Sequence, residues 1–326
     1  MQPTNPHSPG PDVSAGNGRL RIGSVTQNGT VVSSDVSRGG GSTLSFARSL
    51  DYVSMTRPDG TLGIGLDAAW AVAGDAASVA GVDIRELHGT DVTLAQEVIG
   101  QVWGAQLIPQ EVLLRALAHA GCTLLGAVVD EEPIGLDPWV PGMEGRHTPA
   151  LAHDGTGVRS RIGRVGYAVK VWQRAVCMRE GIREIRWTYD PLVARNAHFN
   201  LVKLGAVVES LHANFYGAMV DTVNAGDESD RFEVSWWLDS SRVLAALSGH
   251  PHLPTDVVRS HEIPEDYTTL ARSNPAAVRE ARLAARAALL AAQDARLAIE
   301  WNGGAYRFTR RASTEGLRAS AAVTCD

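Results

Sequence analysis

The chain has 326 residues, of which 44% are hydrophobic and 20% are charged, so it is long enough for one large domain or two modest ones. Its formal net charge of −6 argues against a nucleic-acid-binding protein, because such proteins carry a strongly basic surface. There is no apolar run of about 18 residues that would span a membrane, and the first residues lack the pattern of a signal peptide. The three cysteines show no metal-binding or disulfide spacing, so we expect a cytoplasmic protein that binds no metal.

Residues 1–81 differ in composition from the rest of the chain. Pro, Gly, Ser and Asn dominate there, as in the run at 37–42. Such a segment buries too little apolar surface to offset the entropy that is lost on folding. We therefore predict a largely disordered, low-complexity arm, with at most short strands near 31–32 and 62–66.

Regular structure is predicted to begin at Val82, where apolar and polar residues alternate as in a half-buried strand. Two amphipathic helices should follow, and then three strands, the second of which leads into a loop rich in Pro and Gly. On the second helix we expect Val112, Leu113, Ala116 and Leu117 to face the core. The predicted elements are a strand at 82–87, helices at 91–103 and 110–120, strands at 122–129, 133–136 and 150–158, and a loop at 138–149.

The segment 159–181 holds a basic, glycine-punctuated turn that runs directly into a helix. Free backbone N–H groups and the helix dipole place positive charge at a helix start, so phosphate groups bind there readily. Glycines let the backbone approach such an anion closely, and arginines add charge, so the turn predicts a phosphate or pyrophosphate site. The turn residues are Arg159, Arg161, Gly163, Arg164 and Gly166, and the apolar stripe expected on the helix is Ala168, Val171, Trp172, Ala175 and Val176.

After Gly181 the pattern predicts a strand at 182–189, a helix at 194–204 and strands at 206–212 and 231–238. Residues 241–326 are predicted to form an extension. Within it, Pro275 opens a helix rich in Ala and Arg whose arginines should stay on the solvent side, and Asn302-Gly303-Gly304 predicts a hairpin. We expect this extension to pack on the preceding sheet or to mediate a homodimer.

This order of elements resembles the GCN5-related N-acetyltransferase (GNAT) superfamily, in particular a poorly characterised bacterial branch of it. Five sequence blocks carry the resemblance: WTYDPL from Trp187, ARNAHFNL from Ala194, LGA from Leu204, NFYG from Asn214 and SDR from Ser229. The resemblance covers residues 82–240 and, more loosely, 262–310. It implies an α+β fold in which helices flank a mixed central sheet, followed by the C-terminal extension.

Members of this superfamily bind acyl-coenzyme A at the turn after their fourth strand, which typically reads Arg/Gln-x-x-Gly-x-Gly/Ala. Here Arg164 stands in place of the middle glycine. If Arg164 needs a positive φ, the substitution costs on the order of 1–2 kcal/mol, whereas with a negative φ its guanidinium is tolerated and free to pair with a phosphate. The resemblance assigns acyl-coenzyme A binding to Arg159, Arg161, Gly163, Arg164, Val165, Gly166 and Asn196, although Asn196 is equally well explained as a helix N-cap.

Acyl transfer to an amine also needs an acceptor for the amine proton and a donor for the leaving thiolate. His153 and Asp154 are the candidate bases, since they lie at the end of the expected fourth strand, where the two central strands would separate. Many members place a donor tyrosine three residues before the Leu-Gly pair, but this chain has Leu201 there. His198, Tyr189 and Tyr216 are the candidate substitutes.

The resemblance implies transfer of an acyl group, most simply acetyl, from acyl-coenzyme A to an amine of a small molecule. Asp190 would then bind the substrate amine, pair with Arg195 or shape the Asp-Pro turn. Two alternatives stay open: a donor in the form of an acylated carrier protein, and a non-catalytic module for binding or assembly.

Overall fold

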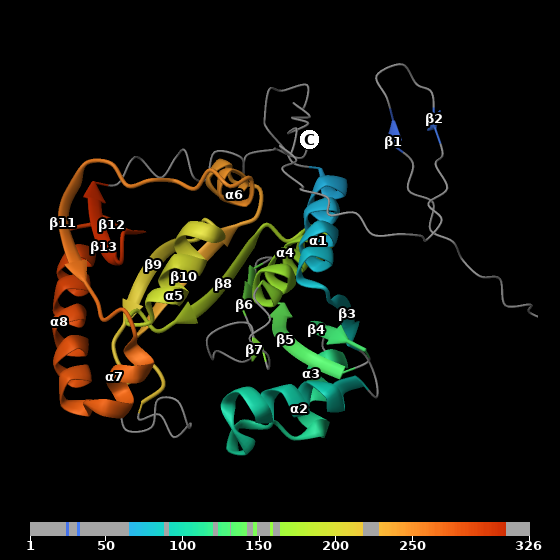
Figure 1. Cartoon of the computed structure of the whole chain (residues 1–326), viewed down its shortest axis with the longest axis horizontal. Coiled ribbons are helices and arrows are strands. Elements are labelled where there is room, and N and C mark those ends of the chain that lie inside the picture. Colours follow the sequence, from blue (N-terminus) through green and yellow to red (C-terminus); the bar gives the residue numbers. More distant parts are fainter. Residues whose placement is uncertain are drawn as a thin grey trace, which may run out of the picture. The chain divides into compact units, whose positions relative to one another are not determined.

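The structure is a computed structural model with an α+β fold, in which helices flank a mixed sheet and a smaller helix-and-sheet unit follows (Figure 1). It describes residues 24–25, 31–32, 65–87, 91–119, 123–130, 132–141, 146–148, 157–158, 164–217 and 228–310. The predicted α+β class is confirmed. Among the described helices, none is both long and apolar enough to cross a membrane.

The main sheet has the strand order β3-β4-β5-β6-β8-β10-β9, and the short β7 pairs with β5. Neighbouring strands are antiparallel except β6 and β8, which run parallel at the centre of the sheet. The strands are β3 (Asp83–Leu87), β4 (Thr123–Val129), β5 (Glu132–Pro141), β6 (Arg146–Thr148), β7 (Gly157–Val158), β8 (Glu184–Tyr189), β9 (Val207–His212) and β10 (Arg231–Trp237).

The region between β5 and α4 differs from its prediction. β5 extends to Pro141 and β6 follows at 146–148, both within the segment predicted as a loop. The Pro and Gly content of that segment was misleading, because a proline fits a strand wherever its missing N–H is not needed by the ladder. The strand predicted at 150–158 is described only as β7, at its end.

The first described residue of the main unit is Gly65, so regular structure occurs before Val82, where it was predicted to begin. Helix α1 (Leu66–Ala80) contacts α4, and its buried alanines recur every three or four residues, as on one helix face. Trp70 of α1 meets Trp172 of α4 edge to face, with ring centroids 5.3 Å apart. The helix was missed because the composition was averaged over the whole arm, whereas its own residues are mostly alanine and other helix formers.

Separately, β1 (Ser24–Val25) and β2 (Val31–Val32) form an antiparallel pair, so the strand at 31–32 is confirmed.

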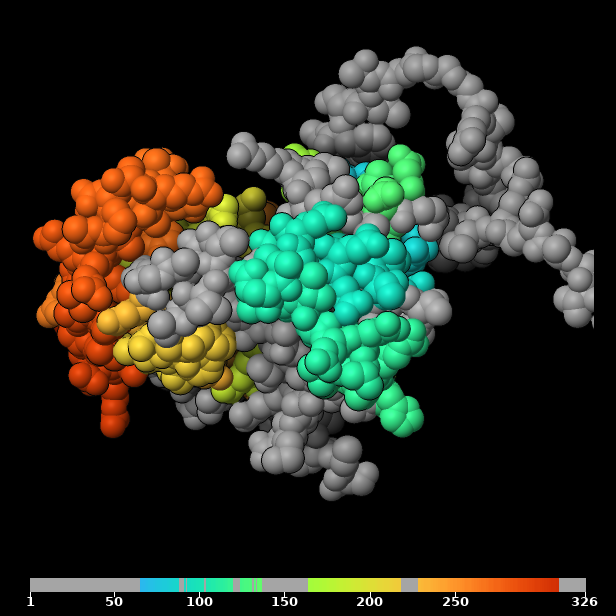
Figure 2. All heavy atoms as spheres, turned by 90° about the horizontal axis from the view of Figure 1, so that it is seen from below, coloured from blue at the N-terminus to red at the C-terminus, as the bar shows by residue number. Residues whose placement is uncertain are grey.

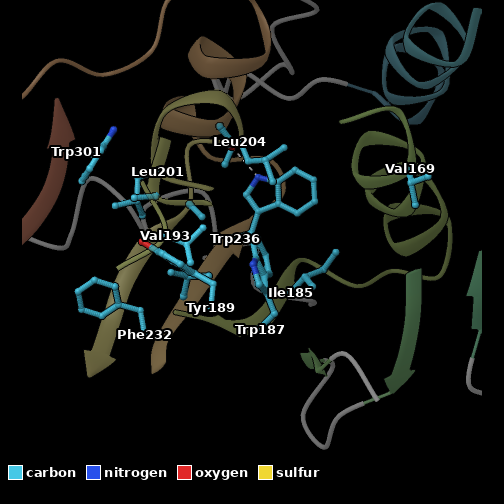
Figure 3. Close-up of a cluster of buried hydrophobic side chains, with 14 of the residues drawn as sticks. Val169, Ile185, Trp187, Tyr189, Val193, Leu201, Leu204, Phe232, Trp236 and Trp301 are labelled. Atoms are coloured by element: carbon cyan, nitrogen blue, oxygen red, sulfur yellow. Dashed lines mark hydrogen bonds between the residues drawn. The ribbon is translucent and has the colours of Figure 1, made fainter. Parts of the chain in front are cut away.

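Helix α4 (Val165–Arg179) is buried on nearly all sides, because α1 covers one side of it and the sheet the other. The predicted apolar stripe is buried, apart from the half-buried Trp172, which confirms its core role. Val169 of this helix belongs to the same buried cluster as Trp187 and Trp236, and Figure 3 shows it to the right of them. These two indole rings meet at 89°, and Trp236 Nε1 donates to the Leu204 carbonyl at 2.8 Å.

Helices α2 (Val92–Trp103) and α3 (Glu111–His119), with the short η2 (Ala105–Leu107) between them, lie together on the face shown in Figure 2. The core face predicted for α3 is wrong. Val112 and Leu113 are 68% and 51% exposed, and Leu114 is the buried residue. Leu114 packs in a buried cluster that includes Ile99 of α2, so the side of α3 that carries Leu114 faces inward.

The residues of the C-terminal extension pack on the main sheet, which was one of the two arrangements expected for them. The predicted hairpin is β12 (Leu297–Asn302) and β13 (Ala305–Arg310), and β12 contacts β9. Tyr306 donates its hydroxyl to the Pro191 carbonyl at 2.8 Å. The other elements are α6 (Ser241–Leu247), β11 (Val257–Glu262), α7 (Tyr267–Ser273) and α8 (Pro275–Asp294), of which α6, β11 and α7 were not predicted.

Candidate active site

The residue that precedes α4, Arg164, has a backbone conformation that is typical of glycine. Arg164 has φ +85° and ψ −12°, a left-handed conformation, and its carbonyl accepts the first helical hydrogen bond from Ala168 at 2.9 Å. Of the two alternatives for this position, the strained one is therefore correct. The conformation turns the chain so that the free N–H groups of the first helical turn point away from the helix. The Arg164 side chain is exposed, so its guanidinium is open to an anion.

Not all residues predicted for the site are described. Arg159, Arg161 and Gly163 lie outside the described residues, as do His153 and Asp154. Val165 and Gly166 form the first turn of α4, and the Val165 side chain is fully buried. Val165 would therefore contact a ligand through its backbone only.

The central strands β6 and β8 pair over a short stretch. Among the described residues they pair at Arg146–Glu184 and His147–Ile185, and β7 pairs with Gly135 and Leu136 of β5. The predicted separation concerned the strand at 150–158, of which the structure describes only β7. In the described part of the chain, residues 186–189 of β8 thus have no strand partner on the side toward β6. An unpaired strand edge presents N–H and C=O groups to an extended ligand or to a carbonyl.

Beyond this edge the chain enters α5 (Ala194–Ala197), which continues as a π-helix at His198–Lys203. Asn196 is not the N-cap of α5, because that position belongs to Val193. The Asn196 amide nitrogen is buried and finds no acceptor among the described residues. The capping alternative is therefore wrong, and this donor is not occupied by another described group.

The π-helix offers no replacement for the missing tyrosine. Its wider turn places Phe199 beneath Leu204, whose N–H it accepts at 3.0 Å. Leu201 is 3% exposed, and Asn200 accepts the Trp187 indole N–H at 3.2 Å. None of these three side chains carries a proton for a thiolate. His198 is largely exposed, and the desolvation of its buried part together with the charge of Lys203 lowers its pKa.

Tyr216 lies beside the unpaired half of β8. Its hydroxyl is 3.0 Å from Thr188 Oγ1, its backbone N–H donates to Ser229 Oγ at 2.8 Å, and its ring packs on Phe215. Tyr189, by contrast, is buried in the core, where burial raises the pKa of its hydroxyl. Of the two tyrosines considered as proton donors, only Tyr216 faces the polar side of the sheet.

A polar cluster that the sequence did not indicate occupies the same face as Thr188. Glu233 is directly opposite Thr188 in the β8–β10 register, so their side chains share a face. Its Oε2 lies 3.0 Å from His212 Nε2 and 3.3 Å from Ser210 Oγ. Although partial burial raises the pKa of Glu233, the hydrogen bond from His212 and the charge of Arg186 outweigh it and hold that pKa below its usual value. Three strands contribute to this cluster, so only the register of the folded sheet brings it together.

Asp190 has a structural role. It is 2% exposed, accepts the Leu192 N–H at 2.8 Å and is bound by the Arg231 and Arg282 guanidinium groups, not by Arg195. It is therefore unavailable to a substrate amine. Within the described residues no group of three potential metal ligands occurs.

No protein-family model matches the sequence, and no curated protein matches it. Solved structures that are similar to this chain include GNAT-family acetyltransferases, as the sequence resemblance predicted. Examples are the ribosomal-protein-S18-alanine N-acetyltransferase from Escherichia coli (13% identity, 49% of this chain and 96% of that one, TM-score 0.40), a GNAT-family acetyltransferase described as putative from Desulfovibrio desulfuricans (17%, 48% and 99%, 0.38) and an aminoglycoside 6′-N-acetyltransferase complexed with coenzyme A (12%, 48% and 97%, 0.37). At such identities and scores the likeness carries no information about substrate or reaction.

Proposed function

We propose that this protein transfers an acyl group, most simply acetyl, from acyl-coenzyme A to an amine of a small molecule. The observation that carries the proposal is the start of α4, where Arg164 adopts a positive φ. A left-handed residue before a helix start is a backbone arrangement suited to binding phosphate. The sequence blocks that resemble GNAT proteins support the same conclusion independently.

In this proposal the pyrophosphate binds the first-turn N–H groups of α4 and the Arg164 guanidinium. The pantetheine arm runs between the separated strands, so that the thioester lies near residues 186–189. The backbone groups of that edge would polarise the thioester carbonyl. Arg159, Arg161, Gly163 and Asn196 remain proposed coenzyme contacts.

The amine would approach from the face that carries Tyr216 and Glu233. Its nitrogen attacks the thioester carbonyl, the C–N bond forms and the C–S bond breaks. The amine proton passes to the His212–Glu233 pair, whose hydrogen bond orients the imidazole as a base, and Tyr216 protonates the departing thiolate. His153, Asp154 and His198 are the other proposed proton carriers.

A ligand series tests the coenzyme part of the proposal. Coenzyme A, acetyl-coenzyme A, dephospho-coenzyme A and pantetheine are each added to the purified protein, and the melting temperature is recorded. A ligand that binds the native state raises apparent stability in proportion to ln(1 + [L]/Kd). We expect larger shifts with the coenzymes than with pantetheine. No shift with any coenzyme would contradict the proposal, and equal shifts with pantetheine and coenzyme A would favour a carrier-protein donor.

Turnover is tested with acetyl-coenzyme A and a panel of small amines. Thiol release reports on cleavage of the thioester, and mass spectrometry identifies the acetylated amine. A Tyr216→Phe variant should slow thiol release by roughly a hundredfold if Tyr216 is the proton donor. Wild-type protein that binds acetyl-coenzyme A but acetylates no amine would favour the non-catalytic alternative.

A further inference from the structure

Two arginines of α8 are tied to the turn that carries Tyr216, although α8 belongs to the C-terminal extension. Arg282 and Arg286 lie one helical turn apart, so both side chains leave the same face of α8. Figure 2 shows the C-terminal residues, in orange, beside the yellow residues at the end of β9, and α8 contacts β9. Each arginine starts a separate chain of contacts toward Tyr216.

The first chain of contacts runs through buried charges. Arg282 donates to both Asp190 oxygens, at 2.8 and 3.3 Å, and Arg231 donates to Asp190 Oδ2 at 3.4 Å. The Arg231 guanidinium carbon then lies 5.4 Å from the centroid of the Tyr216 ring. Because Arg231, Asp190 and Arg282 are at most 2% exposed, water screens these interactions little. Arg282 thereby fixes Asp190, and through it the arginine that supports the Tyr216 ring.

The second chain of contacts holds the backbone of the same turn. Arg286 donates to both Asp230 oxygens, at 2.9 and 2.6 Å, and Asp230 Oδ1 accepts the Asn214 N–H at 2.9 Å. Next to Asp230, Ser229 donates its N–H to Asn214 Oδ1 at 3.2 Å and accepts the Tyr216 N–H at 2.8 Å. The blocks NFYG and SDR, distant in sequence, are therefore one hydrogen-bonded unit that closes onto Arg286.

We infer that Arg282 and Arg286 are positioning residues that hold Tyr216 against Thr188, and that α8 is thus part of the scaffold of the candidate active site. The cluster contains equal numbers of positive and negative charges, so Arg282 and Arg286 neutralise its carboxylates and add no excess positive charge. It contains three arginines and three carboxylates, namely Arg231, Arg282, Arg286, Asp190, Glu228 and Asp230. The catalytic meaning of the inference rests on the proposed function, but its structural content does not.

The test uses the full chain and three variants of α8. Arg286→Met removes the fork that binds Asp230, Arg286→Lys keeps the charge, and Arg279→Met changes an exposed arginine of the same helix as a matched control. Arg286 is preferred to Arg282 because its side chain is 20% exposed, so its loss is better tolerated. Hydrogen exchange is followed at the Asn214 and Tyr216 amides, with the α4 amides as an internal reference.

We expect Arg286→Met to speed exchange at Asn214 and Tyr216 roughly tenfold or more while the α4 amides are unchanged, because the loss of a charge-assisted bond opens the turn locally. Arg286→Lys should restore part of the protection, and Arg279→Met should match the wild type. In protein labelled with 3-fluorotyrosine, the Tyr216 fluorine signal, identified through Tyr216→Phe, should shift most in Arg286→Met, less in Arg286→Lys and not at all in Arg279→Met.

Unchanged exchange and an unchanged Tyr216 signal in Arg286→Met would overturn the inference. Equal acceleration at Tyr216 and in α4 would also overturn it, because the arginine would then stabilise the protein as a whole without positioning this turn. If Arg286→Met shows the local changes but the wild type transfers no acetyl group, the positioning role is upheld and the proposed reaction is rejected. A failure of the inference and a failure of the proposed function are therefore distinguishable.

Discussion

Two arginine-bearing regions of this chain use the same side chain in opposite ways. At the start of α4, Arg164 is exposed and stands beside the free N–H groups of a helix, in a backbone conformation that favours glycine. At the end of β8, Arg231 and Arg282 are buried and both bind Asp190. An arginine already paired with buried carboxylates holds elements of the fold together, whereas an exposed one at a helix start is open to an external anion. The first region is suited to binding and the second to support.

The buried region should respond most strongly to substitution. Asp190→Asn leaves Arg231 and Arg282 buried without their shared counter-charge, and breaking such a pair costs about 3–5 kcal/mol. Urea unfolding should show a loss in that range, whereas Asp294→Asn, at an exposed position of α8, should change stability by less than about 0.5 kcal/mol. A loss below about 1 kcal/mol for Asp190→Asn would mean that the cluster supports the fold far less than its burial implies.

The exposed region should respond with the opposite sign. Arg164→Gly removes a left-handed strain of about 1–2 kcal/mol, partly offset by the greater freedom of glycine in the unfolded chain, so the free energy of unfolding should rise by about 0.5–1 kcal/mol. Arg164→Ala keeps the strain and serves as the matched control. If glycine and alanine gave equal stability, the left-handed conformation would not be strained and the contrast between the two regions would weaken.

A smaller effect is expected from pH at the polar cluster. The pKa of Glu233 is lowered in the folded protein, so its ionised form stabilises the fold above the ordinary carboxyl pKa, and this contribution is lost as pH falls through the lowered value. Glu233→Gln should therefore be less stable than the wild type at pH 7, by less than about 1 kcal/mol, and the difference should shrink as the pH falls through the lowered pKa. Urea midpoints across pH 3–7 measure this, and a difference that grows toward low pH would contradict it.

The sequence predicted the strands and helices from β8 to β10 well, because each has a clear apolar period and a breaker such as Gly205 at its end. It did not predict the role of Arg282. The arginines of α8 were expected on the solvent side, but Arg282 is buried and binds Asp190, which lies 92 residues away in the chain. No local pattern contains such a partner.

The candidate site was predictable to a similar, partial extent. The helix start at Arg164 was located from its glycines and arginines, but φ at that position depends on how the folded chain enters α4. The Glu233–His212–Ser210 cluster was missed because its residues lie on neighbouring strands, where the β9–β10 register with its bulge decides which side chains meet. The alternation of apolar and polar residues shows which side chains share a face of one strand, but it does not show how neighbouring strands are aligned.

The affinity of coenzyme A for the wild type and for two Arg164 variants tests whether the pyrophosphate binds at the start of α4. Arg164→Asn and Arg164→Asp introduce residues that both tolerate the left-handed conformation and differ in charge. Isothermal titration should give a Kd for coenzyme A that rises roughly tenfold in Arg164→Asn and roughly a hundredfold in Arg164→Asp, because a charge-assisted contact is first lost and then replaced by repulsion. The affinity for pantetheine, which has no pyrophosphate, should be the same in all three. Equal coenzyme A affinities in the three forms would show that the pyrophosphate does not bind at the start of α4.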